Sequence, residues 1–261
     1  MSSIQDKSSK GSWYFDVILL TVGIALVFGL FLGTRPLSVP DEARYAEIPR
    51  EMLVLHDFVT PHLNGVKYFE KPPLFYWLQA GSIKQLNPII VQAESTLTET
   101  KRESYVGSIS EWAVRLPNAL VALLGCLLVY AAGRLLFERR AGLLSAIILA
   151  SSLLYFVLAR MVTLDMTLSF CLSASLLAFL VAINGPPGLG RRFLLYSAYS
   201  FSALAVLTKG LVGLLFPTMI IGLWILLTNQ WRLLKQLYLP SGFLLFLLIV
   251  LPWHILVQLK H

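Results

Sequence analysis

Long apolar segments alternate with short polar connections along most of this 261-residue chain. A transmembrane helix needs about 20 predominantly apolar residues, and several segments approach that length. They are residues 13–33, 112–137, 141–159, 166–184, 193–208, 211–228 and 240–258. The pattern predicts an all-α integral membrane protein, a polytopic helix bundle with about seven transmembrane helices.

One polar segment, residues 34–111, interrupts this pattern after the first span. Its irregular backbone would find no hydrogen-bond partners in hydrocarbon, so we expect it at the membrane surface or lining a cavity. We therefore predict a single transmembrane domain over residues 1–261. It would comprise 12 N-terminal residues, the first span, the 34–111 loop, and further spans between residues 112 and 261.

The first part of the polar segment has helical periodicity. Tyr45, Ile48, Met52 and Leu55 recur at spacings of three and four residues, which is typical of one helix face. Such a helix would lie along the membrane. Pro49 lacks a backbone N–H and disfavours helical dihedrals before it, so we expect a break there and a second helix starting at Pro49. The polar side would carry Glu42, Arg44, Glu47, Arg50 and Glu51.

The second part of the polar segment contains turn signals and one more apolar run. Asn64-Gly65 indicates a turn, and Pro72-Pro73 begins the apolar-rich run PPLFYWLQAGSI. That run is too short to cross a bilayer and suits a second interfacial or re-entrant helix. Lys84 to Ser110, rich in Ser, Thr and Glu, indicates a flexible loop.

Composition supports the membrane assignment, because 57% of the residues are hydrophobic and 13% charged, against about 25% charged in soluble domains. The net charge of +7 does not indicate nucleic-acid binding, since the basic residues lie in short loops. With the N-terminus in the cytoplasm, nine tail and short-loop cations lie on that side and three on the other, which fits the positive-inside rule. The nine are Lys7, Lys10, Arg134, Arg139, Arg140, Arg191, Arg192, Arg232 and Lys235, and the three are Arg160, Lys209 and Lys260.

This orientation makes the 34–111 segment extracytoplasmic and gathers the unusual charges on one face. Arg160 and Asp165 lie in one tight connection, and Lys209 lies in another, on the same side as Asp41 and Lys71. Charges at membrane depth are costly and indicate a functional site or a buried pair. Simpler interpretations are that Asp41 only caps a helix and that Arg160 and Asp165 only pair with each other.

The runs DEARYAEIPREM, FVTPHLNGVKYFEKPPLFYWL, RLPNAL, ARMVTLDM and LTKG together resemble a family of membrane enzymes. These are the GT-C glycosyltransferases that take a sugar from a polyprenyl phosphate. The similarity is greatest to the lipid A aminoarabinose transferases and lower to the protein O-mannosyltransferases. It implies a bacterial inner-membrane enzyme that moves 4-amino-4-deoxy-arabinose or a related sugar to lipid A or another extracytoplasmic acceptor.

The resemblance also implies roles for individual residues. Asp41 and Asp165 match the family's aspartates and are candidate catalytic residues. Glu70 corresponds to an acid that can bind a divalent metal ion, the one possible cofactor, and no organic cofactor is expected. The candidate substrate-binding residues are Arg44, Lys71, Arg160 and Lys209.

The expected chemistry explains why these residue types are needed. Breaking the bond between the sugar and the phosphate leaves negative charge on the phosphate, which nearby cations would stabilise. If the acceptor is a hydroxyl group, Asp41 would be the general base. If it is a lipid A phosphate, no base is needed, and Asp41 would stabilise the transition state or orient groups. The sequence leaves both open.

Three alternatives remain at this stage. The protein could be a protein O-mannosyltransferase that uses polyprenyl-phosphate mannose. It could belong to another class, a membrane transporter or lipid flippase, although transporters place their charges near the bilayer midplane. Family members continue through further spans, so we expect the chain to be the N-terminal half of a longer enzyme, and it could also be inactive alone.

Overall fold

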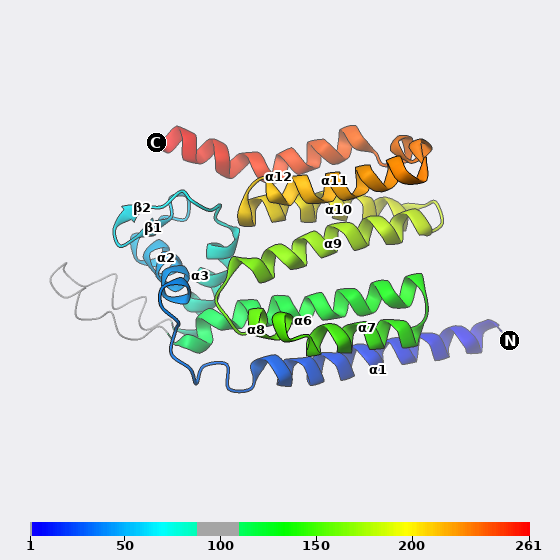
Figure 1. Cartoon of the computed structure of the whole chain (residues 1–261), viewed down its shortest axis with the longest axis horizontal. Helices are drawn as coiled ribbons and strands as arrows, with labels where there is room; N and C mark the ends of the chain where they lie inside the picture. Colours follow the sequence, from blue (N-terminus) through cyan, green and yellow to red (C-terminus); the bar gives the residue numbers. More distant parts are fainter. Residues whose placement is uncertain (1, 88–109) are drawn as a thin grey trace.

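The computed structural model describes residues 2–87 and 110–261, and it is mostly helical. Long helices run beside one another, and shorter elements gather at one end of the bundle, at the left of Figure 1. The bundle is formed by α1 (Ser2–Gly29), α6 (Glu111–Leu136), α7 (Arg139–Ser151), α8 (Leu153–Ala159), α9 (Leu164–Asn184), α10 (Leu189–Lys209), α11 (Val212–Thr228) and α12 (Leu239–Lys260). This confirms the all-α membrane fold.

The length and apolarity of each helix decide whether it can span a membrane. Among the described residues, four helices are long and apolar enough to cross a membrane, namely α1, α6, α9 and α12. The pair α7 and α8 would make a fifth, but it bends by 69° at Ser152, whose backbone is extended. Helix α11 is apolar but shorter, and α10 is not among the helices that are both long and apolar enough to span a membrane. The number seven therefore stays a prediction.

Helix α10 is less apolar than α9, α11 and α12, and all three of these helices pack against it. Its serine side chain at position 202 is buried and donates to the carbonyl of Gly213 at 2.8 Å. On the facing helix, Ser175 donates to the carbonyl of Ala198 at 2.8 Å. Polar side chains satisfied between helices are tolerated in a membrane bundle.

At the cytoplasmic end predicted from charge, α1 is tied to α6 and α7 by one buried carboxylate. Asp16 is 1% exposed and accepts hydrogen bonds from Tyr130 and Arg134, each at 2.8 Å, and from Arg139 at 2.6 and 2.8 Å. A charge within a membrane segment is costly unless it is paired. This network explains how the first span can contain an aspartate.

The elements that cap the other end are α2 (Asp41–Leu55), β1 (His62–Leu63), β2 (Val66–Lys67) and α3 (Leu74–Leu86). The expected break at Pro49 is wrong, because α2 continues through it. Ile48 and Met52 are fully buried beside Pro49, in a cluster with Phe75 of α3 and Val114 of α6. Proline inside a helix costs about 3 kcal/mol, and this burial offsets that cost.

The predicted turn at Asn64-Gly65 joins β1 and β2 into an antiparallel hairpin in which His62 pairs with Lys67. Both turn residues have positive φ, 53° and 75°, as such a tight turn requires. The expected second short helix is confirmed as α3, which begins directly after Pro72-Pro73. The expected loop from Lys84 to Ser110 is displaced at its start, because α3 extends to Leu86, and residues 88–109 lie outside the described residues.

The end of α12 is fastened to the segment between α2 and the hairpin. Trp253 donates from its indole to the carbonyl of Val59 at 2.9 Å, and Lys260 pairs with Asp57 at 2.6 Å. Asp57 also accepts from the N–H groups of Val59 and Thr60. These contacts hold the capping elements on the bundle from a second side.

Candidate functional site

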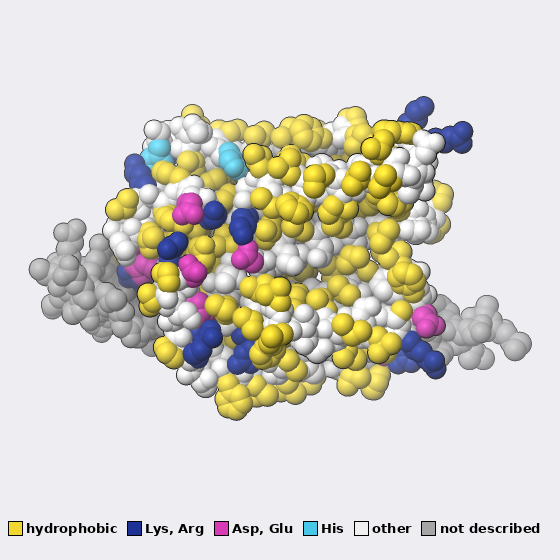
Figure 2. Space-filling view, in the orientation of Figure 1, with side chains coloured by type: hydrophobic (Ala, Val, Ile, Leu, Met, Phe, Trp, Pro, Cys, Tyr) yellow, Lys and Arg dark blue, Asp and Glu magenta, His cyan; other side chains and the backbone are white. Residues whose placement is uncertain are grey.

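The capping end of the bundle carries most of the residues that the sequence singled out. Figure 2 shows acidic and basic side chains gathered over this end, while the visible side of the bundle is largely apolar. Six of the seven candidates lie on α2, on the turn before α3, or where α9 begins and α10 ends: Asp41, Arg44, Glu70, Lys71, Asp165 and Lys209.

Asp41 is the first residue of α2 and is exposed. Within residues 2–87 and 110–261, its carboxylate makes no hydrogen bond or ion pair, so it does not cap the helix through a hydrogen bond. The next residue, Glu42, bonds to the backbone instead. Asp41 therefore presents an unengaged carboxylate at a helix N-terminus, where the helix dipole favours negative charge.

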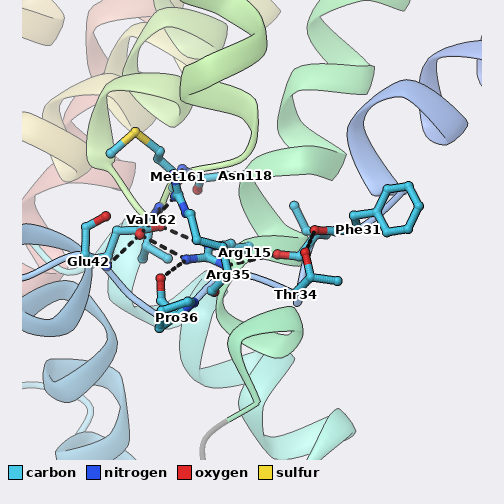
Figure 3. A network of polar contacts seen from close by, with 11 residues as sticks. Phe31, Thr34, Arg35, Pro36, Glu42, Arg115, Asn118, Met161 and Val162 are labelled. Carbon is cyan, nitrogen blue, oxygen red and sulfur yellow. Dashed lines mark hydrogen bonds and ion pairs between the residues drawn. The ribbon is translucent and has the colours of Figure 1, made fainter.

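Glu42 is the buried centre of a network that the sequence did not predict (Figure 3). Its two oxygens accept from the guanidinium of Arg115, both at 3.0 Å. They also accept from the N–H of Ser38 at 2.9 Å and from the N–H of Val162 at 3.0 Å. Arg35 adds an ion pair at 3.2 Å. Placing Glu42 on the polar side of α2 was wrong, and Glu51, 8% exposed, is buried as well.

Arg115 supplies the other half of the network from α6 and is 1% exposed. Besides Glu42, it donates to three backbone carbonyls between α1 and α2 at 2.6 to 3.0 Å, those of Leu32, Arg35 and Pro36. The network therefore joins three segments of the chain to α6: the segment after α1, the start of α2 and the segment before α9. Asp41 and Asp165 each lie within three residues of an atom in this network, so it fixes the backbone from which both project.

The bonds to Glu42 make the stability of the fold depend on pH. Burial opposes ionisation of Glu42, but the bonds from Arg115, Ser38 and Val162 outweigh it and lower its pKa from 4.5 to about 2. Because the folded pKa is depressed, the ionised carboxylate stabilises the fold above about pH 4.5, and this stabilisation is lost as pH falls toward about 2.

We expect the melting temperature of the wild type to fall between about pH 6 and about pH 3 by more than that of Glu42→Gln. The variant should start lower, because it leaves Arg115 buried without its carboxylate. Melting in detergent at both pH values measures this. Equal losses in the two proteins would contradict the depressed pKa of Glu42.

A second group of polar side chains forms around Tyr68, between β2 and α3. The Tyr68 hydroxyl donates to Glu70 at 2.6 Å, and Glu70 pairs with Lys71 at 3.5 Å. Burial and the bond to Glu70 raise the pKa of Tyr68 to about 12, opposed by Arg44. The hydrogen bond from Tyr68 lowers the pKa of Glu70, and Lys71 adds to this effect. The structure therefore brings Arg44, Glu70 and Lys71 together.

Tyr45 links this group to both aspartates. Burial raises its pKa, and the charges of Asp41, Glu70 and Asp165 raise it further, while Arg44 opposes them. The charges of both aspartates and of Glu70 therefore act on the Tyr45 ring. Sequence reasoning treated Tyr45 as part of an apolar face. Its position directly after Arg44, one helical turn from Asp41, was the available signal.

Asp165 and Lys209 form an ion pair with Nζ and Oδ1 2.5 Å apart. Asp165 lies in the first turn of α9 and Lys209 in the last turn of α10, and their side chains are 49% and 36% exposed. The alternative pairing of Asp165 with Arg160 is wrong. An ion pair that is this exposed contributes only about 0 to 1 kcal/mol to stability. A large stabilising effect is therefore not the reason for these two charges.

Arg160 lies on the other side of the Glu42 network. It donates to the carbonyl of Val27 at 3.2 Å, and its guanidinium lies 5.3 Å from the ring centre of Phe156. Among the described residues, it makes no hydrogen bond or ion pair with any other candidate site residue. Lying on the same side of the membrane does not place it in the same cluster.

A metal ion at Glu70 finds an incomplete donor set. Tyr68 and Lys71 already engage its carboxylate, and the ammonium would repel a cation. Residues 2–87 and 110–261 contain no group of three His, Cys, Asp or Glu side chains that could hold a metal. The described residues alone do not provide the ligands of a metal centre. Metal binding by Glu70 stays a prediction.

The chain as a whole is similar to known proteins in sequence and in fold. A family model described as dolichyl-phosphate-mannose-protein mannosyltransferase matches residues 104–256. The chain is 32% identical over 255 residues to the undecaprenyl phosphate-alpha-4-amino-4-deoxy-L-arabinose arabinosyl transferase of Serratia proteamaculans (strain 568). This match covers 95% of the chain and 40% of the relative.

The fold is similar to crystal structures of ArnT from Cupriavidus metallidurans. The apo structure superposes with a TM-score of 0.81 at 33% identity, and the structure bound to undecaprenyl phosphate with 0.81 at 32%. Each match covers 94% of this chain and 42% of the other. The chain thus spans about two fifths of the length of the relatives it matches.

Proposed function

The chain belongs to the family described as dolichyl-phosphate-mannose-protein mannosyltransferases, and on this premise we propose that it provides the reaction centre of a membrane glycosyltransferase. The donor is a sugar on a polyprenyl phosphate, 4-amino-4-deoxy-arabinose by preference, and the acceptor is lipid A. The names of the matched relatives and the bound undecaprenyl phosphate of one of them support this choice. The carrying observation is that the unengaged carboxylate of Asp41 lies at the same end of the bundle as two ion pairs, Lys71 with Glu70 and Lys209 with Asp165. Arg44 lies on the same helix as Asp41 and its charge acts on Glu70.

We propose that the cations receive the charge of the departing phosphate. Lys71 forms an ion pair with Glu70, the charge of Arg44 acts on the same carboxylate, and Lys209 forms an ion pair with Asp165. Fixed positive charges stabilise a developing anion without reorganisation. Asp165 would then act by positioning Lys209. Arg160 is not assigned to this step, because its contacts place it elsewhere.

The role of Asp41 depends on the acceptor. With a hydroxyl acceptor, the carboxylate would remove the hydroxyl proton as the oxygen attacks the anomeric carbon. With a phosphate acceptor, which is already an anion, Asp41 would instead stabilise the positive charge that grows on the sugar. Both roles need a carboxylate free of structural partners.

We place this site outside the cytoplasm, in the inner membrane of a bacterium. The excess of short-loop cations on the side of the N-terminus supports that orientation. The capping elements α2, β1, β2 and α3 lie at the end of the bundle opposite the N-terminus (Figure 1).

An acceptor assay tests the proposed function. Membranes containing the protein are given a polyprenyl-phosphate donor that carries either aminoarabinose or mannose, with either lipid A or an unfolded protein as acceptor. We expect product on lipid A. Product on protein alone, with a mannose donor, would instead favour protein O-mannosylation, which the description of the family model supports.

Lys71→Met gives a variant prediction for the donor site. Removing one charged contact to the phosphate should reduce kcat/KM at least about tenfold, because such contacts contribute about 1.5–3 kcal/mol. Lys84→Met is the matched control, since Lys84 is an exposed lysine of α3 with no role in the cluster. Equal activity of both variants would contradict the role of Lys71.

A further inference from the structure

A separate hollow lies on the far side of the Glu42 network, between the end of α1 and the end of α8. Its volume is 170 Å³, and its wall includes the guanidinium side chains of Arg35, Arg115 and Arg160. Apolar residues complete it, with Phe31 and Val157 among them. The candidate active site does not use this hollow.

Positive charge exceeds negative charge in this hollow. Glu42 is the one carboxylate bonded to these arginines within the described residues, and Arg115 already holds both of its oxygens. Burial lowers the pKa of Arg160, and repulsion from Arg35 and Arg115 lowers it further. The group thus lacks an anion that would balance it.

Two of the three arginines keep hydrogen-bond donors to spare. A guanidinium has five N–H donors. In the described part of the chain, Arg35 uses one on Glu42 and Arg160 uses one on Val27, each at 3.2 Å. The side chain of Arg35 is 54% exposed. Planar guanidinium groups with free donors suit the oxygens of a phosphate.

The position of the hollow identifies the source of the phosphate. It lies where the membrane helix α1 ends, the level at which lipid headgroups meet a membrane protein. Phe31 is 72% exposed and Val157 39% exposed at its edge, so apolar surface borders the charged wall. A lipid presents the same combination of a phosphate beside hydrocarbon.

We propose that this hollow binds the phosphate of an anionic phospholipid. Arg35 and Arg160 donate to the phosphate oxygens, and Phe31 and Val157 contact the acyl chains. A zwitterionic lipid binds less well, because its ammonium group would enter a region of excess positive charge. The bound lipid also lies against Arg115 and so supports the network that holds Asp41.

Native mass spectrometry of the detergent-solubilised protein tests the proposal. The protein is incubated with phosphatidylglycerol, phosphatidylcholine or inorganic phosphate, and the retained molecules are counted. We expect phosphatidylglycerol to be retained at least about tenfold more strongly than phosphatidylcholine. Arg35→Gln and Arg160→Gln should each weaken its retention about tenfold, the effect of losing one charged hydrogen bond.

Arg232→Gln is the matched control, because Arg232 is an exposed arginine of the 3-10 turn Trp231–Gln236 at the opposite end of the bundle. Its phosphatidylglycerol retention should equal that of the wild type. If Arg160→Gln does not fold, Arg35→Gln decides, since its side chain is half exposed. Wild-type retention by Arg35→Gln, equal retention of phosphatidylcholine, or full displacement by inorganic phosphate at equal concentration would each overturn the proposal.

Discussion

Asp41→Asn is expected to lower sugar-transfer turnover at least about a hundredfold, the lower end of what a positioned proton-transfer group contributes. The amide has nearly the shape of the carboxylate but neither its charge nor its basicity. Since Asp41 is exposed and its carboxylate makes no hydrogen bond or ion pair with the described residues, the substitution removes no bond that holds the fold. The melting temperature should stay close to that of the wild type.

The measurement is single-turnover transfer from labelled donor, together with donor binding by the same variant. Donor affinity should be kept, because Asp41 is not among the proposed phosphate contacts. Asp57→Asn is the matched control, since Asp57 is a carboxylate of the same polar segment that bonds Lys260 and two backbone N–H groups. That control should lower the melting temperature and keep turnover.

The two variants separate chemistry from stability. Unchanged turnover in Asp41→Asn would exclude both the general-base role and the electrostatic role of Asp41. Loss of donor binding in the same variant would move Asp41 from the reaction step to the binding of the substrate. Either result would leave the fold and the family assignment untouched.

The helices could be predicted from the sequence because apolar periodicity is a local property. The start of α3 followed from Pro72-Pro73, and the hairpin turn followed from Asn64-Gly65, whereas the end of α3 lies beyond the expected position. Pro49 was the exception. Its local preference for a break is outweighed by the burial of Ile48 and Met52 against α3 and α6, which no local rule contains.

The candidate site could be located but not assembled from the sequence. Motifs marked Asp41, Lys71, Asp165 and Lys209, yet the pairing of Asp165 with Lys209 joins residues 44 positions apart. Sharing a membrane face did not bring Arg160 to them. Topology restricts a residue to one side of the bilayer, and only helix packing decides its neighbours within that side.

Glu42 shows a second limit of pattern reasoning. Periodicity divides a helix into one apolar and one polar face, as if the helix met a single surface. Here α2 also contacts α6, whose Arg115 bonds to Glu42 although the two residues are 73 positions apart in sequence. A charged residue can be buried when its partner is equally buried. The arginine at the start of an otherwise apolar span was the signal that could have indicated this pair.

Arg115→Leu is expected to destabilise the protein by about 3–5 kcal/mol, the cost of leaving a buried charge without its partner. The variant would strand the carboxylate of Glu42 and the carbonyls of Leu32, Arg35 and Pro36. Denaturant unfolding in mixed micelles measures the loss. The matched control is Lys209→Leu, whose exposed ion pair with Asp165 should contribute no more than about 1 kcal/mol.

A double-mutant cycle with Glu42→Leu distinguishes the pair from the sum of two harmful substitutions. Removing both charges leaves no buried ion of the pair without its partner, and Arg35 is half exposed, so the double variant should recover at least about 2 kcal/mol relative to the sum of the single losses. Transfer activity should not recover with it, because the backbone before Asp41 and Asp165 is no longer fixed by the bonds to Arg115 and Val162. Additive losses would show that Glu42 and Arg115 are not coupled. Full activity in a refolded double variant would show that the network stabilises the fold without positioning the two aspartates.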